Sequence, residues 1–161
     1  HPFPGGTASI CYTRPKSRGA VSLMREGGVL RAAIQPNYLD RDEDVQGMLR
    51  GLKLLRRIIN TQPFAEYLEG EHGAGAKANS DEEMIEHIRN NAATIYHPVG
   101  TCKMGNDEMS VVDDHLRVRG LSGLRIADAS IIPAITSGNT NAPAIMVGEK
   151  CADMILSERN R

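Results

Sequence analysis

Ten consecutive residues, YHPVGTCKMG at positions 96–105, constrain this chain more than any other feature of its sequence. They place a histidine before a proline and a Gly-Thr-Cys turn. Two other stretches accompany them: LRIADAS at 124–130, which reads as a strand ending in aspartate, and SGNTNAP at 137–143, an asparagine-rich entry to a helix. The three stretches together form a constellation that composition alone does not explain.

These stretches resemble the C-terminal part of the glucose-methanol-choline (GMC) flavoprotein oxidoreductases, especially the choline dehydrogenase-like alcohol dehydrogenases. The resemblance runs over nearly all of the chain. RPKSRG at 14–19, leading into Val21 and Leu23, and QPNYL at 35–39 resemble the substrate-binding segments of that family. The resemblance implies the C-terminal catalytic segment of an FAD-dependent enzyme that oxidises a primary alcohol, choline-like or other, by base-assisted hydride transfer to the flavin.

The dinucleotide-binding fingerprint of that family is absent from the sequence. Its members carry a Rossmann-type Gly-x-Gly-x-x-Gly, where backbone N–H groups and a helix N-terminus hold the FAD pyrophosphate. The glycine-rich places at 5–6, 27–28 and 70–75 lack the strand-glycine-helix context that this mechanism requires. Because the chain also begins with His1 and not Met, we expect a piece of a larger flavoenzyme, inactive alone, that does not retain FAD by itself.

The length of 161 residues suits one domain with its own core. We expect a single GMC C-terminal domain over 1–161. Residues 1–127 would form the substrate-binding region with the catalytic histidine, and 128–161 the flavin-facing strand end and final helix. The alternative is a stand-alone binding or interaction domain that kept this fold and lost catalysis. Flavin absorbance, alone and with the N-terminal half added, distinguishes the two.

The charge of the chain is nearly balanced, with 19 basic and 20 acidic residues and a formal net charge of −1. This gives no electrostatic basis for binding nucleic acid or an anionic membrane. The expected partners are a small alcohol substrate and an N-terminal FAD-binding part. A piece separated from that part would expose apolar surface, through which it could self-associate.

The three cysteines, Cys11, Cys102 and Cys151, are odd in number and have no C-x-x-C spacing. This disfavours a disulfide framework and a structural zinc site, so no metal is expected. A reducing, cytoplasmic compartment fits best. No apolar run approaches the roughly 20 residues that span a bilayer, and no signal peptide opens the chain. The parent protein could still associate with a membrane through other parts.

The element pattern predicts an α+β domain with a mixed or mostly antiparallel sheet and flanking helices. Residues 19–23 and 29–34 read as strands of a hairpin, separated by Arg25-Glu26-Gly27-Gly28. A helix follows from Asp40, which can N-cap it with Glu43 three residues on. Its apolar positions recur at helical spacing: Val45, Met48, Leu49, Leu52, Leu55 and Ile59.

The sequence after residue 63 predicts two more helices. Residues 64–68 look like a short helical turn and 69–79 like a loop. Ser80 with Glu83 is a capping-box pattern, and the next helix has an apolar face of Met84, Ile85, Ile88 and Ala92. A short strand over 124–127 and a final helix from Ala142 complete the pattern. The expected apolar side of that helix comprises Ile145, Gly148, Cys151, Ala152 and Ile155.

His97 is the candidate general base. Oxidising an alcohol requires removal of its hydroxyl proton, and histidine titrates near operating pH. The resemblance matches His97 to the catalytic histidine of the family, with the turn after it fixing the ring against the flavin. The alternative is a structural histidine, which is the usual role of a lone histidine beside an apolar segment.

Asn139 and Asn141 compete for the second catalytic position, which the family fills with a histidine or asparagine. Asn139 lies 11 positions after Asp128, a spacing that matches the family pattern, and is assigned. Its amide could stabilise an alkoxide without titrating. Asn141 could instead N-cap the last helix or contact the flavin directly.

Four residues are expected at the flavin through the resemblance. Asp128 and Ala129 would approach the flavin and its ribityl chain, and Thr140 and Asn141 the pyrimidine edge. A helix N-terminus there would stabilise negative charge on a reduced flavin. Apart from the family, Asp128 reads as an ordinary strand-end carboxylate.

Cys102 suggests a rival chemistry, because a cysteine near a histidine can be a nucleophile. No third orienting group or oxyanion pocket is recognisable in the sequence, which favours an inert cysteine. Cys151 is expected in the core.

Overall fold

The computed structural model of the chain describes residues 4–159, and His1 lies outside that range. The described residues group into two units by their contacts. Unit 1 comprises residues up to 19 together with 35–93, and unit 2 comprises 20–34 together with the residues from 94 onward. Each unit is described by itself below.

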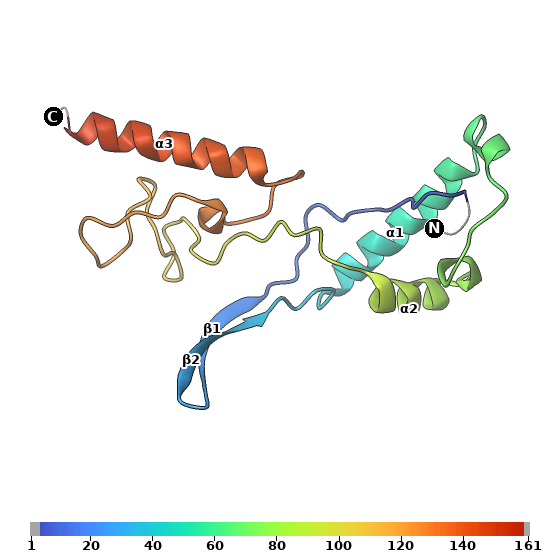
Figure 1. Cartoon of the computed structure of the whole chain (residues 1–161), viewed down its shortest axis with the longest axis horizontal. Helices are drawn as coiled ribbons and strands as arrows, with labels where there is room; N and C mark the ends of the chain where they lie inside the picture. The colour runs from blue at the N-terminus through green and yellow to red at the C-terminus, as the bar shows by residue number, and fades with distance from the viewer. Residues whose placement is uncertain (1–3, 160–161) are drawn as a thin grey trace. The chain divides into compact units, whose positions relative to one another are not determined.

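The first regular elements are β1 (Ala20–Glu26) and β2 (Val29–Gln35), which pair as a two-stranded sheet (Figure 1). The turn between them consists of Gly27 and Gly28, with φ angles of 56° and 83°. Two-residue turns of hairpins need positive φ, which glycine adopts without steric cost. The predicted hairpin and the α+β class are confirmed, with a sheet of two strands in the described residues.

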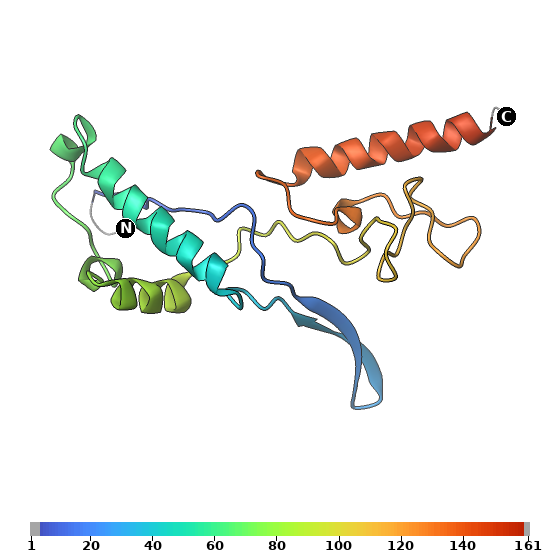
Figure 2. The same ribbon diagram turned by 180° about the vertical axis from the view of Figure 1, so that it is seen from behind.

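Two helices form the core of unit 1: α1 (Asp42–Ile59) and α2 (Asp81–Asn91). They lie side by side in both views (Figures 1 and 2) and bury Leu49, Met84 and Ile88 between them with Ala78 of the preceding loop. The helical spacing of the apolar residues predicted both faces correctly, although Ala92 is exposed at the end of α2.

The two predicted helix caps had different outcomes. The Ser80 hydroxyl accepts the Glu83 N–H at 3.2 Å, and the Glu83 carboxylate accepts the Ser80 N–H at 2.9 Å, so that capping box is confirmed. The Asp40 cap is wrong: Arg41 is the N-cap of α1 and makes no side-chain cap bond. Asp40 belongs instead to the preceding turn, where its N–H donates to the Asn37 carbonyl.

The chain between α1 and α2 contains two short 3-10 helices. The first, η1 (Phe64–Tyr67), confirms the predicted helical turn. The second, η2 (Gly75–Lys77), interrupts the stretch expected to be a plain loop. The Arg56 guanidinium of α1 holds this segment in a regular conformation. It pairs with the Glu71 carboxylate at 2.8 Å and donates to the carbonyl oxygens of Gly75 and Ala78.

Unit 2 packs the last helix, α3 (Asn141–Arg159), along the irregular segment that precedes it (Figures 1 and 2). Its core consists of Val112, Leu116, Ile131, Val147 and Cys151. The buried position of Cys151 confirms its predicted place in the core. No helix in residues 4–159 is long and apolar enough to cross a membrane.

The predicted strand over 124–127 is wrong. Only one residue pair, Arg117 and Arg125, forms an antiparallel bridge there. Hydrogen bonds from Val118 to the Leu124 carbonyl and from Ile126 to the Leu116 carbonyl flank it. The turn residues Gly120 and Gly123 both have positive φ, and the pairing on either side of this turn stays an isolated bridge.

The predicted apolar side of the last helix is wrong at Ile145, Ala152 and Ile155, which are exposed, whereas Cys151 is buried and Gly148 half-buried. Ile145 is 59% exposed and Ile155 41%, whereas Val147 is 6% exposed. The apolar residues of α3 are distributed around the whole helix. Their spacing therefore did not identify the face that meets the core.

Candidate active site

His97 lies in unit 2 on the extended segment after α2 and is half-buried. Its ring nitrogen Nδ1 lies 3.0 Å from the Thr140 hydroxyl oxygen. The backbone N–H of Thr140 also points toward Nδ1, with 3.4 Å between the two nitrogens, and donates to it in the tautomer whose Nδ1 carries no hydrogen. Both ring contacts therefore come from the residue directly before α3.

The backbone on both sides of His97 has unusual conformations. Tyr96 has a φ of 62°, which is uncommon for a bulky residue. Such conformations cost on the order of 1–3 kcal/mol and cluster at functional sites. Gly100 has a φ of 88°, and a Cβ there would lie 3.3 Å from the Ile132 carbonyl oxygen. The turn after the histidine therefore requires glycine for both its conformation and its close approach.

The turn after His97 is fixed to η3 (Ala129–Ile131), the short 3-10 helix that follows Asp128. The Cys102 N–H donates to the Ser130 carbonyl at 3.0 Å, and the Met104 N–H donates to the Ile131 carbonyl at 2.8 Å. The segments at 96–105, 128–131 and 140–141 are thus joined by hydrogen bonds within one unit. These are the segments that the sequence singled out.

Thr140 occupies the N-cap position of α3, since its carbonyl accepts the Ala144 N–H at 2.9 Å. It is 7% exposed. The cap alternative for Asn141 is therefore wrong by one residue, because Asn141 is the first residue of the helix itself. The contact of Thr140 with His97 was not predicted, because no local sequence signal identifies a contact between residues 43 positions apart.

Asn139 and Asn141 flank Thr140 along the chain, and both are exposed. Within residues 4–159 their side-chain amides make no hydrogen bond. They are therefore available to a bound molecule beside the His97–Thr140 pair. A catalytic role for Asn139, and a flavin contact by Asn141, stay predictions.

Asp128 is exposed and caps η3, with its carboxylate accepting the Ser130 N–H at 2.7 Å. Hydrogen bonds from the Ser130 side chain and backbone hold the pKa of Asp128 below its usual value. Ala129 is half-buried as the first residue of η3. This capping gives Asp128 a structural role, and contact of both residues with the flavin stays a prediction.

Cys102 is half-buried, and its backbone N–H, rather than its thiol, makes the bond to Ser130. Among the residues that the structure describes, no group of three or more His, Cys, Asp or Glu side chains is placed to hold a metal. The groups that contact the His97 ring are the hydroxyl and the backbone N–H of Thr140, both of which form hydrogen bonds.

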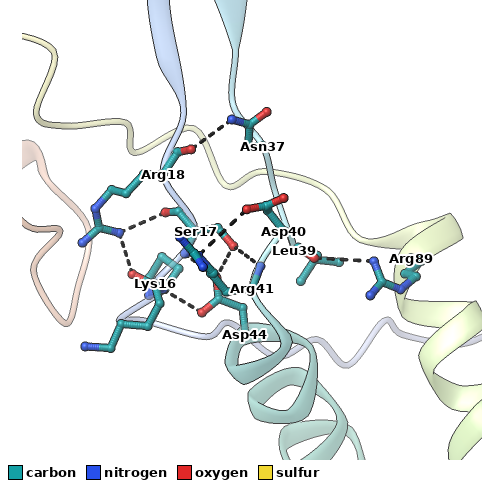
Figure 3. Close-up of polar contacts among 10 residues, drawn as sticks. Lys16, Ser17, Arg18, Asn37, Leu39, Asp40, Arg41, Asp44 and Arg89 are labelled. Carbon is teal, nitrogen blue, oxygen red and sulfur yellow. Dashed lines mark hydrogen bonds and ion pairs between the residues drawn. The ribbon is translucent and has the colours of Figure 1, made fainter.

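The two segments that resemble substrate-binding segments lie together in unit 1 (Figure 3). Asp44 of α1 is 2% exposed and accepts the backbone N–H groups of Lys16 and Ser17 at 2.7 and 2.8 Å, and the Ser17 hydroxyl at 2.5 Å. The Asn37 side chain donates to the Arg18 carbonyl at 3.0 Å. The segments are thereby held to each other and to the start of α1.

Comparison with known proteins gives a consistent result. The profile of the C-terminal region of GMC oxidoreductases matches residues 15–148. The chain is 45% identical over 152 residues to an alcohol dehydrogenase (acceptor) of Pseudomonas putida, a match that covers 94% of this chain and 28% of that protein. It is 46% identical over 142 residues to an oxygen-dependent choline dehydrogenase of Cronobacter sakazakii, covering 88% of this chain and 25% of that protein.

The fold is also found in solved structures. A formate oxidase variant of Aspergillus oryzae RIB40, solved to examine FAD modification, superposes with a TM-score of 0.87 and 30% identity. The match covers 98% of this chain and 29% of that chain. The chain therefore spans less than a third of the length of each of these relatives.

Proposed function

The chain belongs to the GMC oxidoreductase family, and we propose that it is the C-terminal catalytic segment of an FAD-dependent oxidoreductase that oxidises a primary alcohol. The observation that carries this proposal is the 3.0 Å contact between His97 and Thr140. It joins a histidine, a residue type that can exchange a proton, to a helix start where two side-chain amides make no hydrogen bond within residues 4–159. The names of the two curated relatives support an alcohol as substrate.

In this proposal His97 is the general base. Its Nδ1 faces Thr140, so Nε2 is the nitrogen left to accept the hydroxyl proton of the alcohol. The amide of Asn139 donates a hydrogen bond to the same oxygen and stabilises the alkoxide. A positioned acid-base group contributes roughly 10²–10⁴ in rate. FAD, when bound, supplies the acceptor for the hydride from the carbinol carbon.

The donor groups at the start of α3 fit a flavin. The first turn of α3 has no acidic side chain. No carboxylate of that turn therefore neutralises the partial positive charge of the helix N-terminus. A helix N-terminus stabilises negative charge, which accumulates on the pyrimidine side of a reduced flavin. Asn141 and the backbone of Thr140 would contact that edge, and Asp128 and Ala129 would lie toward the ribityl chain.

We further propose that a second part of the complete protein supplies the remaining FAD site and covers the hairpin. The hairpin exposes apolar side chains on both strands, among them Leu23 at 77% and Ile34 at 69%. A two-stranded hairpin is at best marginally stable by itself in water. A partner surface on β1 and β2 would bury these side chains, and without it they favour self-association.

The test is anaerobic mixing of the complete FAD-loaded protein with a series of primary alcohols, including choline. Bleaching of the oxidised flavin absorbance by at least one alcohol is expected. The 161-residue chain alone, dialysed against buffer, should retain little FAD. A complete protein whose flavin no alcohol reduces would contradict the proposed reaction, and stoichiometric FAD on the dialysed chain would contradict the need for a second part.

A further inference from the structure

We propose that the Thr140 hydroxyl is a positioning group that sets the tautomer of His97 and keeps its Nε2 able to accept a proton. This inference rests on the proposed role of His97 as the base. The inference concerns the side-chain hydroxyl of Thr140. The contact proposed with the flavin edge is made by the backbone of Thr140.

The two contacts to Nδ1 differ in what they allow. A neutral imidazole has one N–H and one acceptor nitrogen. The Thr140 backbone N–H can only donate, so its 3.4 Å contact is satisfied when Nδ1 accepts. The ring proton then lies on Nε2, which in that form cannot take a proton from the substrate.

The Thr140 hydroxyl allows the other tautomer. A hydroxyl both donates and accepts, so Oγ1 at 3.0 Å can accept a hydrogen bond from Nδ1–H. This is the shorter of the two contacts and lies within the usual range of 2.7–3.2 Å, which the amide contact exceeds. When the lone pair of Nε2 is free, the ring hydrogen is on Nδ1. Of the two groups that contact Nδ1, only the hydroxyl can accept a hydrogen bond from it.

Burial makes the hydroxyl hard to replace. Thr140 is 7% exposed, so water has little access to substitute for a missing acceptor at Nδ1. After the alcohol proton has been transferred to Nε2, the imidazolium still carries a hydrogen on Nδ1. The Thr140 oxygen can therefore keep accepting that hydrogen bond. Thr140 itself neither gains nor loses a proton in the reaction.

The reaction step is balanced with this arrangement. The O–H bond of the alcohol breaks and its proton forms a bond to Nε2 of His97. The C–H bond of the carbinol carbon breaks, and its hydrogen leaves as hydride with both bonding electrons, which FAD, when bound, would accept. The alcohol becomes an aldehyde, and the Nδ1–H bond to the Thr140 oxygen stays in place throughout.

The test compares Thr140→Val with Thr140→Ser in the complete FAD-loaded protein. Valine keeps the shape and removes the hydroxyl, whereas serine keeps the hydroxyl. The readout is the ¹⁵N chemical shifts of the His97 ring nitrogens, with the signal assigned by its loss in His97→Gln. The second readout is the rate of flavin reduction by alcohol, and a thermal melt checks that each variant is folded.

Thr140→Val should shift the neutral ring toward the form with the proton on Nε2, because the amide is then the remaining partner. The rate should fall by on the order of 10–100-fold, the loss seen when a metal-ligating histidine is deprived of the partner that fixes its tautomer. Thr140→Ser should resemble the parent protein in both. An unchanged ring tautomer in folded Thr140→Val, or equal losses in the valine and serine variants, would overturn the inference. A shifted tautomer with an unchanged rate would support the positioning role and contradict the proposed role of His97.

Discussion

The Thr140 hydroxyl and Nδ1 of His97 lie 3.0 Å apart although 43 residues separate them in sequence. This hydrogen bond joins the segment after α2 to the start of α3. The backbone bonds from Cys102 and Met104 to η3 fix the same segment from the other side. The position of the candidate base is therefore determined by the packing of unit 2.

The two asparagines beside Thr140 should be separable by substitution in the complete protein. If Asn139 donates to the substrate oxygen, Asn139→Ala should lower the rate of flavin reduction by on the order of 10²–10³ with flavin content near normal. Asn141→Ala should instead shift the flavin potential, because Asn141 is the first residue of α3. A larger kinetic loss at Asn141 would show that the assignment is misregistered by two residues.

Asp44→Asn should destabilise the chain. Three hydrogen bonds converge on this buried carboxylate, and hydrogen bonds to charged groups contribute about 1.5–3 kcal/mol each. Because asparagine retains one acceptor oxygen, the expected loss is about 2 kcal/mol in the free energy of unfolding at pH 7. Urea titration measures it, with the exposed Asp40→Asn as control. Equal effects of the two substitutions would contradict the structural role of Asp44.

The pH dependence of this difference follows from the pKa of Asp44. Burial alone would raise that pKa, but hydrogen bonds from Lys16 and Ser17 and the nearby Arg18 charge lower it below 3.8. Folding then favours the ionised form, and the contribution is fully present above pH 3.8. The difference between parent and variant should shrink as the pH falls below that value.

Glu158 binds both Arg117 and Arg125, and the hydrogen bonds from Arg125 and Arg117 lower its pKa from 4.5 to about 2. Its contribution to stability should be present above pH 4.5 and be lost between pH 4.5 and about 2. Glu158→Gln should lower the melting temperature at neutral pH and low salt more than at 1 M salt, where charges are screened. Glu149→Gln on the exposed side of α3 is the matched control. A salt-independent loss at Glu158 would contradict an electrostatic role.

The face of α3 that meets the core can be tested with two neighbouring residues. Val147→Ala should cost about 1.5–3 kcal/mol in the free energy of unfolding, because two buried methyl groups are lost and a cavity remains. Ile145→Ala should change the stability of this chain by less than about 0.5 kcal/mol, the usual range for a surface site. The reverse order in urea titration would support the face expected from the sequence.

Local signals in the sequence predicted the local structure. The Gly27-Gly28 turn and the Ser80–Glu83 box each depend on residues at most three positions apart, and both are confirmed. The Asp40 cap was wrong because a turn formed by Asn37 competes for the same residues. The local sequence alone did not predict whether Asp40 would cap the helix or belong to the turn.

Features that depend on distant contacts were not predicted. The buried side of α3 is set by Val112, Leu116 and Ile131, which the helix sequence does not contain. The bond between Thr140 and His97 depends in the same way on the packing of unit 2. The family resemblance predicted the residues of the candidate site, and only the structure gives their hydrogen-bond partners.

The most direct test of the account is the rate of flavin reduction by alcohol in the complete protein carrying His97→Ala. We expect a fall of roughly 10²–10⁴-fold at unchanged flavin content, the usual contribution of a positioned acid-base group. His115→Ala, at an exposed histidine of the same unit, should leave the rate unchanged. Flavin reduction at the parent rate in His97→Ala would show that His97 is structural and contradict the proposed reaction.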